Sequence, residues 1–162
     1  MVRTDKINYY LDIAETVCKR STCLRRMYGA IIVLNDEIIA TGYNGAPRGR
    51  ANCVDIGRCL RDEMNIPSGE RYELCRSVHA EANAIISAAR KDCIGATMYL
   101  AGINGKTGEL LSDTTSCSMC RRLIINAGID KIVARTGRGK NDYVVTDVSE
   151  WVQKDDSLYF EQ

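Results

Sequence analysis

Residues of the kind that bind metal ions stand at the starts of two predicted helices. His79, the one histidine of the chain, is followed by Ala80 and Glu81, and Cys117 and Cys120 open a second helix. Because residues three positions apart share one side of a helical turn, both sulfurs point the same way. A helix N-terminus also favours the thiolate that binds metal. One imidazole and two thiolates leave the fourth position of a tetrahedral zinc open, which is typical of a catalytic site.

Glu81 lies two residues after His79, where its carboxylate could face a metal-bound water without being a ligand. Zinc lowers the pKa of such a water to about 7, so Glu81 could take the proton and return it to a ring nitrogen. A purely structural zinc would fill its fourth position with a protein ligand and would not need this carboxylate. The alternative is a core histidine near a coincidental thiol pair, and the order of the two motifs argues against it.

The two motifs together resemble the signature of the zinc deaminases, in which His-x-Glu precedes Pro-Cys-x-x-Cys. The Gly-Tyr-Asn-Gly sequence at 42–45 and the long insert before His79 are similar to the deoxycytidylate branch of the cytidine and deoxycytidylate deaminase family. The likeness runs from about residue 7 to about residue 135. The stretches that carry it are 29–33, 41–49, 77–85 and 117–129.

The resemblance implies an α/β fold of the three-layer α/β/α cytidine-deaminase type, with a mixed five-stranded sheet, in a single deaminase domain over residues 1–162. It implies hydrolytic deamination of dCMP to dUMP and ammonia, which supplies dUMP for dTMP synthesis. In this reading His79, Cys117 and Cys120 hold the catalytic zinc, and Glu81 carries the protons. One alternative is a deaminase that acts on another substrate: a nucleoside, a tRNA adenosine or guanine. The other alternative is a non-catalytic binding module stabilised by zinc.

Substrate contacts are also implied by the resemblance. Asn44 would hydrogen-bond the sugar, with Gly45 beside it, and the backbone of Ala80 would meet the pyrimidine carbonyl. Asn after a strand is also an ordinary turn residue. The family has proline where this chain has Ser116, which we keep among the substrate-binding candidates. Serine can act as a helix N-cap in place of proline, so we expect the backbone to keep its course.

A monophosphate substrate needs cationic donors, and arginine binds phosphate with a bidentate fork. Arg25 and Arg26 precede the first predicted strand, and Arg48 and Arg50 flank the Gly-Tyr-Asn-Gly sequence. Arg26 and Arg48 are the best candidates, because both adjoin strands that carry motifs. For any single surface arginine, a solvated charge is the plainer interpretation.

An irregular insert covers about 44–78 and has no sustained apolar period. A loop of this length in a compact domain is usually functional or held in place. Four thiolates would complete a structural zinc site there, although the spacing is not that of a double Cys-x-x-Cys, and four reduced thiols are the alternative. The candidate ligands are Cys23, Cys53, Cys59 and Cys75. The remaining Cys18 and Cys93 are expected in the core.

The elements that position these residues follow from the apolar periodicity. Strands alternate with helices in the second half, which predicts βαβ-type crossovers and a mixed sheet with helices on both faces. The expected helices are 6–19, 79–91, 117–127 and about 148–154, and the expected strands are 29–34, 37–42, 95–100 and 131–134. The loop 102–115 is long for the family and would serve as a lid, an interface or plain surface.

Composition limits the partners of the chain. It has 162 residues, the size of one domain, and a net charge of +1. A near-neutral chain has no electrostatic footprint for nucleic acid or for an anionic membrane, and it has neither an apolar run of spanning length nor a signal-peptide core. We therefore expect a cytoplasmic protein without nucleic-acid or membrane partners. The resemblance implies a homo-oligomer, with a hexamer favoured, dCTP and dTTP as allosteric effectors, and Mg²⁺ bound with such a nucleotide.

Overall fold

A mixed five-stranded sheet forms the centre of the molecule, as expected. The computed structural model describes the backbone of residues 1–160 and the side chains of residues 1–154. The strand order is β2-β1-β3-β4-β5, in which β3 and β4 are parallel and the other neighbours antiparallel. The strands are β1 (Arg26–Leu34), β2 (Glu37–Tyr43), β3 (Thr97–Asn104), β4 (Lys131–Arg135) and β5 (Tyr143–Asp147).

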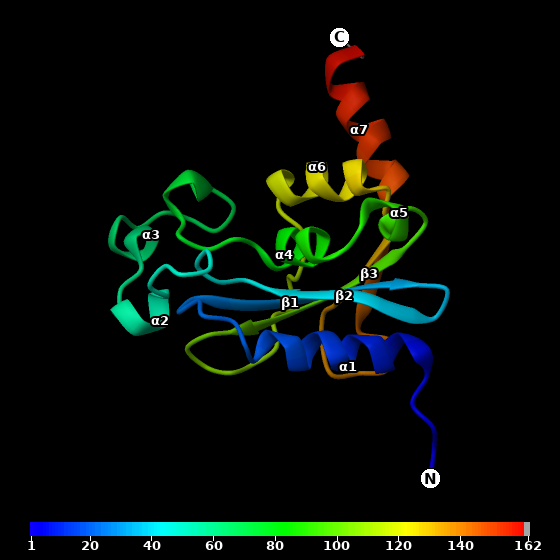
Figure 1. Ribbon diagram of the computed structural model, residues 1–162, viewed down its shortest axis with the longest axis horizontal. Helices are drawn as coiled ribbons and strands as arrows, with labels where there is room; N and C mark the ends of the chain where they lie inside the picture. Colours follow the sequence, from blue (N-terminus) through cyan, green and yellow to red (C-terminus); the bar gives the residue numbers. More distant parts are fainter. Residues whose placement is uncertain (161–162) are drawn as a thin grey trace.

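Helices cover both faces of this sheet, which gives three layers (Figure 1). One face carries α1, and the other carries α4 and α6, with α7 beside α6. The short α2 and α3 and a 3₁₀ turn, η1, lie in the insert between β2 and α4. The helices are α1 (Lys6–Cys18), α2 (Cys53–Ile56), α3 (Leu60–Glu63), η1 (Tyr72–Leu74), α4 (Ala80–Ser87), α5 (Arg90–Cys93), α6 (Ser118–Ala127) and α7 (Val148–Phe160).

Two apolar cores lie against the two faces of the sheet. Alternate residues of β1 point to opposite sides, so Ile31 packs in the core under α1, while Ala30 and Ile32 pack in the core under α4 and α6. Cys18 and Cys93 are fully buried in these two cores, as the sequence predicts. The central strands β1, β3 and β4 are thus buried on both faces, and they hold the helix starts at fixed places.

The start of α4 is pressed close to β2. A Cβ atom on Gly42 would lie 2.3 Å from both the Ala80 carbonyl oxygen and the Ala84 nitrogen. Because real Cβ contacts are never that short, only glycine allows this approach. The close packing places His79, which precedes α4, at the carboxyl end of β2 beside the Gly-Tyr-Asn-Gly sequence.

Three sequence-based expectations differ from the structure. The helix expected over 79–91 is two helices, because Ala88 and Ala89 adopt extended conformations that end α4. The strand β5 was not expected, because it is an edge strand with mostly exposed residues and lacks a buried apolar run. The last helix extends beyond the expected 154. Among the described helices, none is long and apolar enough to cross a membrane.

Candidate metal centre and substrate cavity

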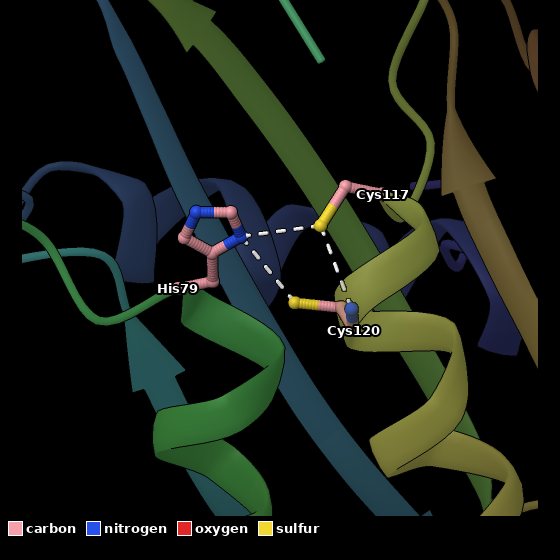
Figure 2. Close-up of side chains that lie close together, drawn as sticks. All are labelled: His79, Cys117 and Cys120. Atoms are coloured by element: carbon pink, nitrogen blue, oxygen red, sulfur yellow. Dashed lines mark hydrogen bonds between the residues drawn. The ribbon is translucent and has the colours of Figure 1, made fainter. Parts of the chain in front are cut away.

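The predicted ligand set comes together where two helices begin side by side (Figure 2). His79 is the N-cap residue of α4, and Cys117 is the N-cap residue of α6. The His79 Nδ1 atom lies 3.5 Å from the Cys117 sulfur and 3.4 Å from the Cys120 sulfur. The three side chains therefore converge on one point from two different helices.

These three residues fit a zinc ion. Nitrogen and sulfur ligands at ordinary zinc distances in a tetrahedron would lie about 3.6 Å apart, close to the separations seen here. The Nδ1 atom and the two sulfurs all lie within 4.8 Å of one another. The donor set is one imidazole and two thiols, which suits zinc and leaves one coordination position for water or substrate.

Electrostatic interactions within the group favour a thiolate. Hydrogen bonding with Cys120 lowers the pKa of the Cys117 thiol to about 4, against the opposing effect of burial. The same hydrogen bond, together with burial, raises the pKa of Cys120. Burial opposes the charge on His79, but hydrogen bonds with Cys117 and Cys75 outweigh it and raise the pKa of the imidazole to about 10. A divalent cation would displace the remaining protons, as it does at coordinating thiols.

Glu81 lies in the first turn of α4, two residues after His79, and is 5% exposed. Burial raises the pKa of its carboxyl group, and the neighbouring His79 partly offsets this effect. A raised pKa is what a group that both accepts and returns a proton requires near neutral pH. Glu81 is therefore suited to proton transfer beside the metal group and is not part of the ligand set.

A cavity of about 390 Å³ opens onto this group. His79, Glu81 and Cys117 form part of its wall, and the insert forms another part. A cavity of this volume is in the usual range for small-molecule sites. Its wall also carries several arginines, which suits an anionic ligand. These arginines are Arg25, Arg26, Arg58, Arg61 and Arg76.

Comparison with known proteins identifies the family of the chain. The family model described as the cytidine and deoxycytidylate deaminase zinc-binding region matches residues 4–136. The chain belongs to this family. The matched range includes the three converging residues and Glu81, and their roles as zinc ligands and proton carrier stay predictions.

Relatives within the family agree with this assignment. The deoxycytidylate deaminase of Mycobacterium phage D29 is 38% identical over 137 residues, covering 82% of this chain and 96% of that protein. The deoxycytidylate deaminase of Schizosaccharomyces pombe is 32% identical over 139 residues, covering 86% of this chain but 39% of that protein. The chain thus spans well under half the length of the yeast relative. The apo dCMP deaminase of cyanophage S-TIM5 aligns with a TM-score of 0.56 and 25% identity, over 87% of this chain and 90% of that one.

Asn44 of this deaminase-family chain lines the cavity but is largely engaged within the protein. Its Oδ1 atom accepts hydrogen bonds from the Tyr28 backbone at 2.8 Å and from the Ser21 hydroxyl at 2.6 Å. Its Nδ2 atom donates to the Arg26 carbonyl at 2.8 Å. The side chain therefore ties the start of β1 to the end of β2, and its predicted contact with a sugar hydroxyl stays a prediction.

The two arginines predicted to bind phosphate lie in different places. Arg26 lines the cavity and forms an ion pair with Asp113 at 3.1 Å. Arg48 is exposed and is not part of the cavity wall, so a phosphate contact from it stays a prediction. Arg25 also lines the cavity, and its Nε atom pairs with Asp62 at 2.8 Å. The Nη1 atom of Arg25 is buried without a hydrogen-bond partner among the described residues, which leaves it available to an anion.

The backbone candidates surround the metal group without lining the cavity. Gly45 pairs with Val78 through two backbone hydrogen bonds, which clamp the two ends of the insert together. Ala80 opens α4, where its N–H has no acceptor within the helix. Ser116 is 2% exposed, and its hydroxyl has no partner in the described part of the chain. The expectation that Ser116 caps α6 is wrong, because the Cys117 sulfur accepts from the Cys120 backbone and provides the cap.

The four candidate cysteines, three in the insert and Cys23 just before β1, all line the same cavity. Burial raises the pKa of the Cys53 thiol, and the thiols of Cys23, Cys59 and Cys75 raise it further, so the four groups lie near one another. Among the described residues, His79, Cys117 and Cys120 are the group whose ligand atoms all lie within 4.8 Å of one another, so the sulfurs of the four candidate cysteines are not gathered as closely. A second zinc on these residues stays a prediction.

Sequence reasoning missed two residues of the insert that bear on the metal group. The Tyr72 ring packs edge-on against the His79 ring. The Arg61 guanidinium lies over the face of the Tyr72 ring. Neither residue belongs to a motif with a recognisable spacing. A buried arginine in an otherwise polar insert leaves no periodic signal in a sequence.

Proposed function

We propose that this chain catalyses the hydrolysis of dCMP to dUMP and ammonia. The observation that carries the proposal is the place of Glu81, whose buried carboxyl lies in the wall of the same cavity as His79 and Cys117. A carboxyl beside a three-ligand metal group, but outside it, is what deamination of a pyrimidine needs. The names of the relatives from phage D29 and Schizosaccharomyces pombe support dCMP as the substrate.

Glu81 would move both protons that the reaction transfers. The carboxylate takes a proton from the attacking water and delivers it to N3 of the pyrimidine, and it carries the second proton to the amino group, which leaves C4 as ammonia. A zinc ion held by His79, Cys117 and Cys120 would supply the Lewis acid that makes water a nucleophile near neutral pH. The raised pKa of Glu81 supports this role, because a buried carboxyl holds a proton more readily than a solvated one.

Recognition of the phosphate distinguishes a nucleotide deaminase from a nucleoside deaminase. Wild-type protein is expected to turn over dCMP at least about tenfold better than deoxycytidine in kcat/KM, because hydrogen bonds to a charged group contribute about 1.5–3 kcal/mol each. Ammonia release is measured with dCMP, deoxycytidine, guanine and a tRNA, and zinc is counted per chain in the same sample. Turnover of guanine or tRNA alone would favour another deaminase, and zinc without any turnover would favour a binding module.

Arginine variants locate the phosphate contact. Arg26→Gln is expected to remove most of the preference for dCMP over deoxycytidine, because Arg26 lines the cavity. Arg48→Gln is the matched comparison, since Arg48 is exposed outside the lining. An equal loss in both variants would show that Arg48 also reaches the phosphate. A loss in neither would direct attention to Arg25, whose buried Nη1 atom has no partner among the described residues.

We propose a second, structural zinc on Cys23, Cys53, Cys59 and Cys75. Support comes from the four thiols lining one cavity, with three of them in an insert that has few regular elements and Cys23 just before β1. Folding of such a segment would be coupled to metal binding. The sulfurs would have to draw closer together on binding, by side-chain rotation within the insert.

Cys53→Ser is expected to remove about one zinc per chain and to lower the melting temperature, while the catalytic zinc stays. The measurement is zinc content and thermal unfolding of the purified protein, with Cys93→Ala as the control because Cys93 lies in a core away from the cavity. A single zinc per fully loaded wild-type chain, with these four thiols freely reactive under native conditions, would rule the second site out.

The remaining predictions from the family likeness belong to this proposal. They are a homo-oligomer, with a hexamer favoured, regulation by dCTP and dTTP with Mg²⁺, and action in the cytoplasm to supply dUMP. Each can be measured on the same preparation, through the molar mass in solution and through the dependence of the rate on added dCTP or dTTP.

A further inference from the structure

A series of three side chains runs from the insert to the metal group. The Arg61 guanidinium carbon lies 4.5 Å from the centre of the Tyr72 ring. The Tyr72 ring meets the His79 imidazole edge-on, with ring centres 4.7 Å apart and an angle of 87° between the planes. The insert thereby contacts the imidazole whose Nδ1 atom lies close to the two sulfurs.

Arg61, the residue of this series farthest from the metal group, is fixed in place by hydrogen bonds. Arg61 is 6% exposed, and its Nη2 atom donates to the carbonyls of Pro67 and Glu70 at 2.8 Å each. No carboxylate pairs with it among the described residues, so its charge rests against carbonyl oxygens and the face of Tyr72. A desolvated guanidinium over an aromatic ring is a favourable contact. The hydroxyl of Tyr72 also accepts from the Gly69 backbone at 3.2 Å, which limits movement of the ring.

At the other end of the series, the Tyr72 ring contacts the His79 imidazole, which must face the metal. The Nδ1 atom of His79 points to the two sulfurs, while the edge-on Tyr72 ring of the insert contacts the same imidazole. Groups that contact a ligand histidine from outside the metal fix its orientation and strengthen metal binding. The Gly45–Val78 bridge holds the ends of the insert next to His79, so the insert cannot move away as a whole.

We propose that Tyr72 and Arg61 are positioning residues that hold the His79 imidazole in the orientation for zinc. This role gives the insert a function besides forming part of the cavity wall. It rests on the zinc site of the proposed function, but not on the identity of the substrate. A competing role for Tyr72, direct contact with the pyrimidine, predicts a different result in each measurement below.

The first test compares Tyr72→Leu with Tyr72→Phe, which keeps the ring and loses only the hydroxyl. Tyr72→Leu is expected to weaken zinc binding at the catalytic site by about 10–100-fold. Tyr72→Phe should stay close to wild type, because the edge-on ring contact remains. Zinc affinity is measured on the full-length protein by competition with a chelator, and the reactivity of the insert thiols is followed in parallel to separate loss of any insert zinc. Tyr9→Leu is the control, since Tyr9 is an exposed tyrosine on α1.

The second test concerns the guanidinium. Arg61→Met, which keeps the length of the side chain and removes its charge, is expected to weaken zinc binding about two- to tenfold. The visible absorption spectrum of Co²⁺-substituted protein should change in Tyr72→Leu and Arg61→Met but not in Tyr72→Phe, because the spectrum reports ligand geometry. If Tyr72→Leu does not fold, Arg61→Met and Tyr72→Phe still decide the matter.

Two outcomes would overturn the inference. Unchanged zinc affinity in Tyr72→Leu with a raised KM would assign Tyr72 to substrate contact instead. Equal weakening in Tyr72→Leu and Tyr72→Phe would show that the ring contact is not what matters. The two proposals can fail separately. If the wild-type protein does not deaminate dCMP but Tyr72→Leu still loses zinc affinity, the proposed substrate is refuted and this inference stands.

Discussion

Glu81→Ala is expected to lower dCMP turnover at least about 10²-fold while zinc stays bound. Glu81 lies in the cavity wall beside the ligands, but the three converging donor atoms come from His79, Cys117 and Cys120. Removing the carboxyl therefore removes the proton carrier and leaves the metal ligands in place. The measurement is the rate of ammonia release together with zinc content per chain.

Glu81→Gln is the matched variant for this experiment. It keeps the size of the buried side chain and removes only the ability to carry a proton, so any effect of an empty space in Glu81→Ala is separated from the effect on proton transfer. We expect both variants to be inactive to a similar degree. Turnover near the wild-type rate in Glu81→Gln would refute the proposed proton transfer.

Cys117→Ser and His79→Ala are expected to lose both the catalytic zinc and nearly all activity. Two remaining ligands hold zinc poorly. The His79 Nδ1 atom lies 3.5 Å from one sulfur and 3.4 Å from the other, so removing the imidazole takes away the nitrogen ligand next to both thiols. The measurement is zinc per chain by elemental analysis after dialysis, with activity on the same samples.

Cys93→Ala is the control for the ligand variants, because Cys93 is equally buried but lies in the core and not in the cavity wall. It should keep a full zinc count and its activity, apart from a modest loss of stability. An unchanged zinc count in Cys117→Ser would mean that the ligand set is different from the one inferred here.

Local spacing made the catalytic group predictable from the sequence. A helix start, a separation of three residues between Cys117 and Cys120, and a carboxylate two residues after His79 are all features of short segments. These spacings place each motif at a helix start, and the packing of α4 against α6 then brings the two helix starts together. Short segments also indicate the hairpin turn at Asn35 and Asp36, both with positive φ, and the Gly128 cap of α6.

The expected sheet was also largely correct, since apolar periodicity reports burial directly. The sequence did not indicate β5, because an edge strand with exposed valines has no buried face to leave a pattern. Nor did it indicate the break between α4 and α5, where residues with good helix propensity are held in extended conformations by the tertiary structure.

Only the tertiary structure decided which residues in and near the insert face the cavity or contact His79. Arg26 faces the cavity and Arg48 does not, although both flank motif-bearing strands in the sequence. Tyr72 meets His79, and Arg61 meets Tyr72, through contacts that no periodic pattern announces. The physical reason is the same in each case. Spacing along a helix or strand fixes a side chain's direction locally, whereas the course of an irregular segment depends on what it packs against, and that is settled only when the whole chain folds.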